Sequence, residues 1–416
     1  MTIAKAFRGP LARSIAVTFG AKIVGAMLAL VTSVIIARTL GPEGRGAFAA
    51  VSALAGIGSQ FANLGLQASN SYYLARDRSL LPTVAANSAA VSLVAGLTAA
   101  SVLAVYALWS GMAADVGSGL LTVALLGIPV SLAYMLFVGL LIPMSKVGQF
   151  NRVEIAIKIL TLILILGVSL LDSAPTALQF LFAGLVAQIV MVVAAWRSIN
   201  LPVGTLSKLS LPQLLEHLPF AFRAHLASFF AFLLVRIDML MVQQISGNAE
   251  AGYYSIAVSM ADLLYMFPAT VGALLFPRLS AVNDESSRLR ATLKALLGTA
   301  VAMSLMAIAA VFLAAPLIGL MFGERFLPAA PMFHVLALAI VAYGLNNVLS
   351  NHMASIGLPW KGVWLWLVGV VVNIVLNLYW IPAYGGWGAA MASLVAYVLV
   401  LIVQTGVVFG VRGVVR

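Results

Sequence analysis

Long apolar runs constrain this chain more than any other feature of its sequence. They recur along all 416 residues, and many reach the about 20 residues that a helix needs to cross a bilayer. The chain is 63% hydrophobic and only 8% charged, which is far more apolar than a soluble core of this size requires. We therefore predict an all-α protein that crosses a membrane many times.

Short polar turns divide the apolar runs into twelve predicted spans. They cover roughly 13–38, 45–74, 82–109, 119–146, 152–172, 176–197, 219–246, 251–278, 288–314, 326–353, 359–380 and 384–410. Adding 206 to the first six spans brings them close to the last six, which indicates a duplicated unit. We expect two pseudo-symmetric six-helix bundles, residues 1–208 and 209–416. The bundles should share one orientation, because each has an even number of helices.

A glycine-rich turn after the first predicted span returns after the seventh. Gly41 and Gly46 correspond to Gly247 and Gly252 at the same offset of 206 residues. Gly41 and Pro42 are expected to end a helix, because proline interrupts the hydrogen-bond ladder and glycine accepts the positive φ of a C-terminal cap. The repeated turn supports the duplication.

This turn, LGPEGRGAF, resembles that of the polysaccharide and oligosaccharide flippases of the MOP superfamily, the Wzx-like exporters. Three later segments fit the same family in order: RIDMLMVQQISGNAEAGYYSIA (236–257), PLIGLMFGERFLPAAP (316–331) and IPAYGGWGAAMASLVAYV (381–398). The resemblance implies a MATE/MOP-like fold. It also implies alternating-access flipping of an undecaprenyl-pyrophosphate-linked oligosaccharide for surface polysaccharide assembly. Its partners would be this lipid-linked oligosaccharide, the lipid bilayer and polysaccharide polymerase machinery.

The formal charge is +11, and the basic residues are concentrated in the loops on one predicted side of the membrane. This is the asymmetry that the positive-inside rule expects of a membrane protein. Three basic residues fall on the predicted outer side, namely Arg38, Arg45 and Arg325. The predicted inner side has Lys5, Arg8, Arg13, Arg76, Arg78, Lys146, Arg152, Lys158, Arg197, Lys208, Arg278, Arg288, Arg290, Lys294, Lys361, Arg412 and Arg416. Both termini are thus expected in the cytoplasm, and the family resemblance implies a bacterial inner membrane. Nucleic acid is not an expected partner, because no soluble domain carries a basic face.

The chain has no cysteine and four scattered histidines, so it offers no disulfide framework, no thiolate and no metal-ligand spacing. We predict no metal site and no cofactor, with H⁺ or Na⁺ as a coupling ion at most. The predicted outer loops are short, whereas membrane glycosyltransferases, polymerases and ligases usually place acids or bases on a sizeable one. We therefore predict that the protein is not an enzyme.

Five ionisable side chains are predicted to be intramembrane, where a charge is costly and usually functional. Lys22 lies roughly 14 Å into its helix, on a face of small and polar residues. It either contacts an anionic head group or pairs with a carbonyl or carboxylate. Arg223 lies near the cytoplasmic boundary and is a candidate for meeting substrate on entry. Arg236, Asp238 and Asp262 complete the set.

Arg236 and Asp238 point about 200° apart on one helix, so each needs a partner elsewhere. Asp262 is the expected partner of Arg236. Asp238 stands where the resembled exporters commonly have aspartate. Asp238 and Asp262 are therefore either structural or the carboxylates that couple transport to H⁺ or Na⁺.

A polar stripe on the second predicted helix is a candidate sugar-facing wall, because amides both donate and accept hydrogen bonds. Its residues fall within a wedge of about 80° if the helix is continuous. They are Ser52, Gly56, Gln60, Asn63, Gln67 and Asn70. Hydrogen bonding between helices is the alternative use of these groups. Five tryptophans (360, 364, 366, 380 and 387) are expected to form an interfacial belt.

Two other transporters remain as alternatives. A MATE multidrug exporter would share the fold but should favour aromatic and acidic residues for organic cations. Here three of the five intramembrane charges are basic, which favours an anionic substrate. Lipid II flippases resemble fourteen-span proteins, whereas this chain has twelve predicted spans.

Overall fold

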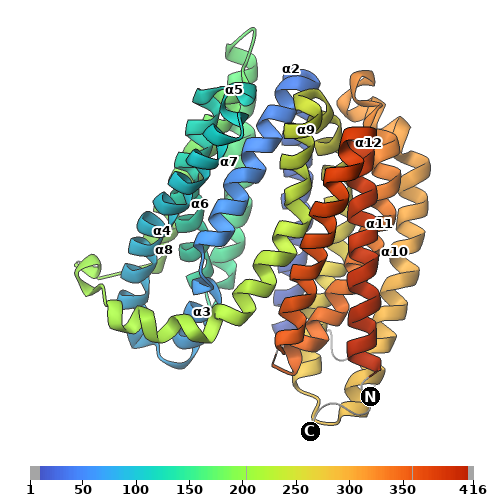
Figure 1. Cartoon of the computed structure of the whole chain (residues 1–416). Coiled ribbons are helices and arrows are strands. Elements are labelled where there is room, and N and C mark those ends of the chain that lie inside the picture. The colour runs from blue at the N-terminus through green and yellow to red at the C-terminus, as the bar shows by residue number, and fades with distance from the viewer. Residues whose placement is uncertain (1–9, 203, 358, 411–416) are drawn as a thin grey trace. The chain divides into compact units, whose positions relative to one another are not determined.

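The computed structural model describes residues 10–202, 204–357 and 359–410, without the side chains of 10–19, 217–221, 223 and 224. All regular structure in these residues is helical (Figure 1). The helices are α2 (Pro10–Ala62), α3 (Leu66–Arg76), α4 (Leu81–Trp109), α5 (Met112–Val116), α6 (Ser118–Leu140), α7 (Val147–Leu171), α8 (Ala177–Ile199), α9 (Leu211–Ser280), α10 (Glu285–Phe322), α11 (Ala329–Ser355) and α12 (Trp360–Phe409). Short 3₁₀ turns lie at Arg78–Leu80, Thr205–Lys208 and Glu324–Phe326. In the described residues, nine helices are long and apolar enough to cross a membrane.

Three of the long helices are bent at a glycine with a positive φ. The φ and ψ angles are 65° and −176° at Gly41 in α2, and 86° and 176° at Gly247 in α9. Gly385 in α12 has a φ of 57° and a ψ of −140°. These conformations are open almost only to glycine. Gly41 and Gly247, 206 residues apart, therefore have nearly the same backbone conformation.

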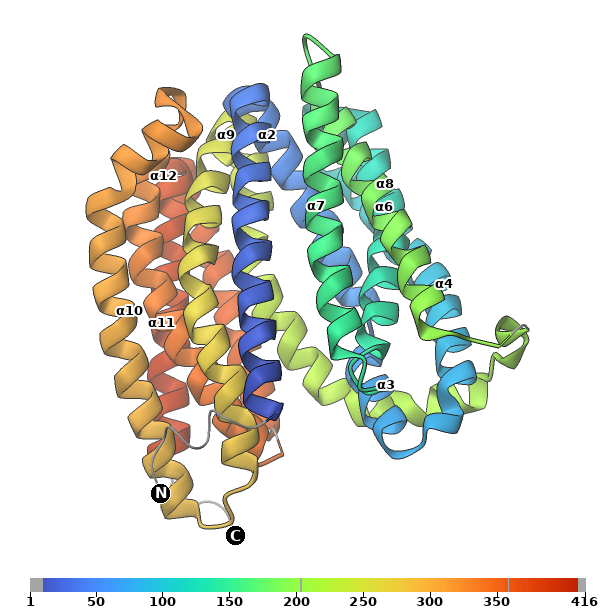
Figure 2. The ribbon, with the colours of Figure 1, turned by 180° about the vertical axis from the view of Figure 1, so that it is seen from behind.

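The chain forms two compact units. The first unit runs through Leu40 and resumes from Leu54 to Phe222, and the second contains Gly41–Ala53 and the chain from Arg223 onward. In the first unit, α4, α6, α7 and α8 lie side by side (Figure 2). In the second, α11 packs on both α10 and α12. The segment 41–53 of the first half of the sequence thus packs with the second half.

Two close backbone contacts hold this segment in the second unit. A Cβ atom on Gly46 would overlap with the carbonyl oxygen of Asn248, and one on Gly252 would overlap with that of Pro42. Residues 46 and 252 are 206 apart, and so are residues 42 and 248. The two contacts are therefore equivalent under the internal repeat, and both require glycine.

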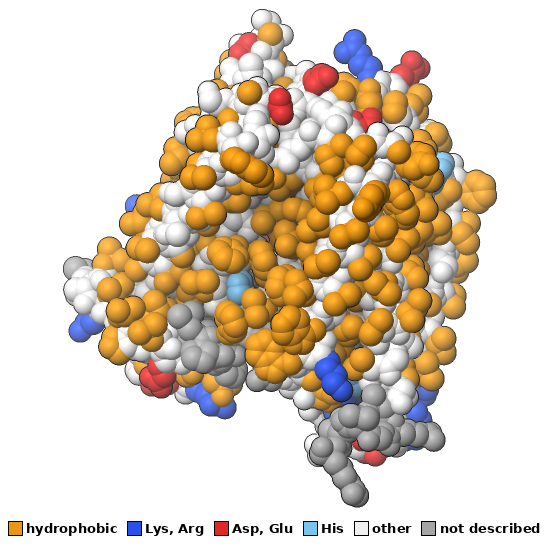
Figure 3. Space-filling view, viewed as in Figure 1, with side chains coloured by type: hydrophobic (Ala, Val, Ile, Leu, Met, Phe, Trp, Pro, Cys, Tyr) orange, Lys and Arg blue, Asp and Glu red, His pale blue; other side chains and the backbone are white. Residues whose placement is uncertain are grey.

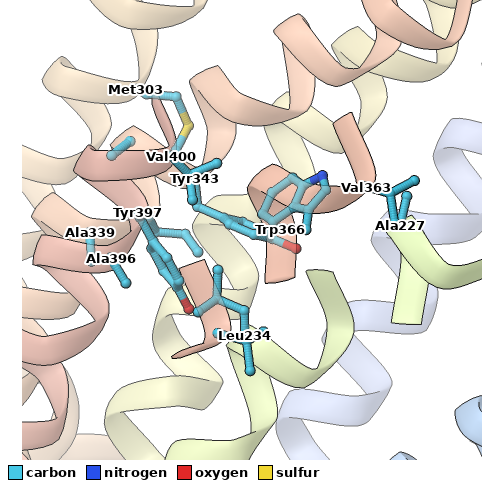
Figure 4. Packing of buried hydrophobic residues seen from close by; sticks show 13 residues of the cluster. Ala227, Leu234, Met303, Ala339, Tyr343, Val363, Trp366, Ala396, Tyr397 and Val400 are labelled. Atoms are coloured by element: carbon cyan, nitrogen blue, oxygen red, sulfur yellow. The ribbon is translucent and has the colours of Figure 1, made fainter. Parts of the chain in front are cut away.

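Each unit has its own apolar core. In the second unit the core gathers around Leu234, Tyr343, Trp366 and Tyr397 (Figure 4). Trp366 is 6% exposed, so its placement in an interfacial belt was wrong. It lies in the second turn of α12, where helix packing buries it. The first unit has a separate core of Leu74, Val84, Ala85, Phe137, Val138, Leu140, Leu141, Val153, Ala195 and Ile199.

Large apolar side chains also cover the outer flanks of the helices. Figure 3 shows them over most of the visible face, with charged side chains near the helix ends. Leu171 is 91% exposed, Phe312 79% and Leu320 75%. Water would penalise such exposure, whereas lipid does not.

Several predicted spans differ from the observed helices at their ends, and two of these differences bear on the site. The span predicted at 45–74 is broken, because α2 ends at Ala62 and α3 starts at Leu66. Leu64 and Gly65 have φ angles of 49° and 79° at this break, which a helix cannot accommodate. The span predicted at 152–172 begins at Val147, five residues earlier.

Candidate functional site

The predicted pair of Arg236 and Asp262 is confirmed. Both residues belong to α9, on either side of the bend at Gly247, so the bend folds one part of the helix back beside the other. An Arg236 amino nitrogen lies 3.0 Å from Asp262 Oδ2, and the side chains are 33% and 41% exposed. The pair is thus hydrogen-bonded but open on one side, at a depth where charges are costly.

Polar groups continue along α9 and α11 on both sides of this pair. Toward the bend, buried Arg45 donates to Ser255 Oγ at 3.1 Å and to Ser259 Oγ at 3.4 Å. On the side of the pair away from the bend, Asn347 of α11 donates a hydrogen bond to the Tyr265 hydroxyl at 3.0 Å. The second unit therefore contains a polar track through its apolar helices. Arg45 had been assigned to an outer loop.

Asp238 lies on the other side of α9 and is 1% exposed. Its carboxylate accepts hydrogen bonds from Asn377 Nδ2 at 2.7 Å, from the Tyr254 hydroxyl at 3.0 Å and from Ser393 Oγ. Asn377 also donates to Asn373 Oδ1 at 3.0 Å. In the described residues, no basic side chain lies within 4.0 Å of Asp238. A carboxylate from α9 is thus held by neutral groups of α9 and α12.

Lys22 is exposed, twelve residues after the start of α2 at Pro10. A Cβ atom added to Gly25, on the same face of the helix, would have no heavy atom within 4 Å, so there is open space beside the lysine. No carboxylate lies within 4.0 Å of its ammonium among the described residues. The Arg223 side chain lies outside the described residues.

The polar stripe predicted as a sugar-facing wall is not continuous. The helix break at 63–65 separates its two ends. Asn63 is buried and accepts a hydrogen bond from the backbone amide of Gln67 at 3.3 Å. Asn70 is buried and donates to Ser88 Oγ of α4 at 2.9 Å. Gln60 and Gln67 are half-buried, and so is Ser52, whose hydroxyl donates a hydrogen bond to the Phe48 carbonyl at 2.7 Å.

Lys158 and Glu154 are the intramembrane charges that sequence reasoning missed. Lys158 had been counted with the cytoplasmic residues, but it lies 11 residues after Val147 and 13 before Leu171, in the middle of α7. Glu154 accepts a hydrogen bond from the Tyr134 hydroxyl of α6 at 2.7 Å. The predicted span 152–172 already contained both residues, but its late start placed them near the cytoplasmic end of the helix.

Three aspartates outside the spans have lowered pKa values because of local hydrogen bonds. Ser79 lowers the pKa of Asp77, and the backbone amide of Ala174 and the side chain of Gln179 lower that of Asp172. Asp284 caps α10, and bonds from Ser287 and Ser286 lower its pKa. These groups shape loop ends. Among the described residues, no three His, Asp or Glu side chains gather as a metal site would require.

Comparison with known proteins decides the family. Residues 11–283, more than half of the chain, match the model of a family described as polysaccharide biosynthesis protein. The chain belongs to this family. The predicted resemblance to this polysaccharide family is therefore confirmed, and the long apolar helices of the described residues are those of a multi-pass membrane protein.

The chain is also similar to curated archaeal proteins. It is 26% identical over 160 residues to an uncharacterised membrane protein of Methanocaldococcus jannaschii, covering 38% of this chain and 32% of that protein. It is 21% identical over 166 residues to a probable low-salt glycan biosynthesis flippase, Agl15, of Haloferax volcanii. This match covers 39% of this chain and 35% of that protein. The match thus spans about a third of each relative.

Two solved structures share the fold over nearly the whole chain. The lipid II flippase MurJ in an inward closed conformation gives a TM-score of 0.72 at 14% identity, covering 96% of this chain and 88% of MurJ. An inward-facing multidrug resistance MATE transporter of the MOP superfamily also gives a TM-score of 0.72, at 15% identity. This match covers 94% of this chain and 96% of that transporter. These likenesses establish the MATE/MurJ-like fold.

Proposed function

We propose that this protein is a flippase that moves a polyprenyl-pyrophosphate-linked oligosaccharide across the membrane by alternating access. The observation that carries the proposal is the presence of half-exposed or exposed cations inside apolar helices, Arg236 in the second unit and Lys22 in the first. Such charges are stable only beside water or a polar ligand. A pyrophosphate with attached sugars offers both negative charge and hydroxyls.

The relatives support this choice of cargo. The family is named for polysaccharide biosynthesis, and the relative from Haloferax volcanii is named a probable glycan biosynthesis flippase. Undecaprenyl pyrophosphate is the bacterial carrier that we favour, with the inner membrane as the location. Both termini would then face the cytoplasm, in keeping with the basic loops. Polysaccharide polymerase machinery would receive the exported glycan.

The structure is consistent with twelve spans. Dividing α2, α9 and α12 at their bent glycines turns nine long helices into twelve. We propose that these form the two pseudo-symmetric six-helix halves, with Gly41–Ala53 exchanged into the second packing unit. The chain then crosses between the units at residues 40–41, 53–54 and 222–223.

We propose that the head group travels along protein while the lipid tail stays in the bilayer. Sugars and phosphates cannot cross hydrocarbon without polar partners. Lys22, Arg223 and Arg236 would hold the phosphates, and Gln60 and Gln67 would bind sugar hydroxyls. Asn63 and Asn70 remain weaker candidates, because existing hydrogen bonds already use them.

Asp238 is the proposed coupling carboxylate. It is buried among neutral groups and lacks a cationic partner in the described structure. A buried carboxylate of this kind is stable when it takes up H⁺ or binds a cation such as Na⁺. Asp262 is the weaker coupling candidate, because Arg236 already balances its charge.

The test is a flipping assay with the purified full chain in liposomes. The probe is a fluorescent oligosaccharide on polyprenyl pyrophosphate, and external quenching reports its transfer between leaflets. We expect transfer above that of protein-free liposomes. Ethidium loaded into parallel vesicles tests the MATE alternative, and a fluorescent lipid II tests the other flippase class. Transport of ethidium without the glycan probe would refute the proposal.

A further inference from the structure

The centre of α7 carries a charged stripe that the proposed set of substrate residues does not include. At about 100° per residue, five polar side chains fall within a wedge of about 80°. They are Asn151, Glu154, Lys158, Thr161 and Ser169. We call this set the α7 stripe.

The α7 stripe is not the lipid-facing side of the helix. Ile159, Ile163, Leu166 and Leu170 are 43%, 57%, 39% and 82% exposed. They cluster around a direction about 110° from Lys158. The helix therefore separates an apolar outer face from a polar face that includes an exposed lysine.

Lys158 is too deep to reach either membrane surface. At 1.5 Å per residue, its Cα atom is about 16 Å from one end of α7 and about 20 Å from the other. A lysine side chain cannot snorkel over that length. An exposed ammonium at this depth requires water or an anion beside it.

The nearest carboxylate on the same helix is turned toward another partner. Glu154 precedes Lys158 by one turn, which is the favourable order for a helical ion pair. Glu154 nevertheless accepts its hydrogen bond from Tyr134, and no carboxylate lies within 4.0 Å of Lys158 among the described residues. The ammonium is therefore left available to a ligand.

Neighbouring helices supply polar groups at similar depth. Tyr134 belongs to α6, and Ser131, one turn earlier, donates to Gln188 Oε1 of α8 at 3.0 Å. Helices α6 and α7 are joined by the short turn 141–146 and run in opposite directions. Ser131 thus lies toward the level of Lys158, and three helices of the first unit have polar groups there.

We propose that the α7 stripe is an anion-binding station at mid-membrane depth, where Lys158 contacts the phosphate of the lipid-linked cargo. This rests on the proposed function for the identity of the cargo. A phospholipid phosphate has the same chemistry, but it belongs to the interface, about 15 Å away from the centre of a bilayer. The nearby carboxylate of Glu154 limits the affinity of this site for phosphate. The cargo can therefore leave the site, as passage through a binding site requires.

Cysteine labelling tests the station without any transport. Thr161→Cys and Ile163→Cys are made separately in the cysteine-free chain, reconstituted in phosphatidylcholine and treated with anionic and cationic impermeant methanethiosulfonates. We expect position 161 to react, faster with the anionic reagent, and position 163 to remain unlabelled in lipid. Lys158→Gln should lower the anionic-to-cationic rate ratio at position 161 about tenfold. Lys158→Arg should preserve this ratio.

Arg152→Gln is the matched control, because it removes an equal charge from the lipid-facing side of the same helix. It should leave the ratio unchanged. Equal labelling at 161 and 163, or a ratio that Lys158→Gln does not alter, would overturn the proposal. Gel filtration of each variant separates these results from misfolding.

Ligand protection distinguishes the source of the phosphate. Farnesyl pyrophosphate should slow labelling at position 161, and Lys158→Gln should remove this protection. Protection by phosphatidylglycerol but not by farnesyl pyrophosphate would overturn the cargo assignment. Failure of glycan flipping with charge-selective labelling intact would instead refute the proposed function and leave an anion site in place.

Discussion

Arg236 of the second unit lies 3.0 Å from a carboxylate, whereas Lys22 and Lys158 of the first unit have none within 4.0 Å among the described residues. Asp238, also in the second unit, is enclosed by neutral donors. The second unit thus supplies hydrogen-bond partners for both of these charges from its own residues. The first unit leaves its deep cations open to a ligand.

This difference suggests a division of labour between the two units. A charge that is already paired gains little from a new partner, because binding must first break the existing contact. An unpaired cation has no ion pair to break before it binds an anion, so it loses only part of its hydration. We therefore expect anion binding to depend mainly on the first unit, and ion coupling and stability to depend mainly on the second.

The largest expected effect comes from Asp238→Leu, which would break the enclosed site of the second unit. Removing the carboxylate leaves donors from Asn377, Tyr254 and Ser393 without an acceptor, at a cost of about 1–3 kcal/mol each. We expect a large loss of thermal stability in detergent. Asp238→Asn should keep much of the stability but abolish dependence on an ion gradient. A stable, gradient-dependent Asp238→Leu variant would contradict both expectations.

Lys22 offers the matching test in the first unit. A charge-assisted contact is worth about 1.5–3 kcal/mol, so Lys22→Ala should raise the apparent KM for the glycan probe about 10- to 150-fold. Lys22→Arg should retain more activity, and Lys22→Glu should be the most impaired because it repels phosphate. The melting temperature should change little, since Lys22 has no carboxylate partner. Normal flipping by Lys22→Glu would remove this lysine from the substrate path.

The repeated backbone contacts offer a third test. Gly46→Ala and Gly252→Ala would each insert a methyl group into a neighbouring carbonyl, with overpacking of this kind costing about 1–3 kcal/mol. We expect similar losses of melting temperature for the two variants, because their contacts are equivalent. Gly406→Ala is the control, since no atom lies within 4 Å of its added methyl. Unequal losses at 46 and 252 would show that the repeat is not equivalent in energy.

The helical character and the correspondence of Gly41 with Gly247 could be read from the sequence, because span length and turn glycines are local properties. The Arg236–Asp262 pair followed from helical geometry and the need to balance charge. The enclosure of Asp238 could not be predicted, since it depends on Asn377 and Ser393, more than 130 residues away. Lys158 was missed because the start of α7 was placed five residues late, which moved a mid-helix lysine toward a loop.

The smallest expected effect concerns the open pair of the second unit. Asp262→Asn leaves Arg236 without its ionic partner, but both side chains are partly exposed, so the loss of stability should be at most about 1 kcal/mol. The freed guanidinium should then resemble the unpaired cations of the first unit. We therefore expect Asp262→Asn to tighten binding of farnesyl pyrophosphate, measured by thermal shift, and Asp262→Asn with Arg236→Gln to reverse this gain. Unchanged affinity in Asp262→Asn would show that pairing does not limit Arg236, and the contrast between the units would then rest on Lys22 and Lys158 alone.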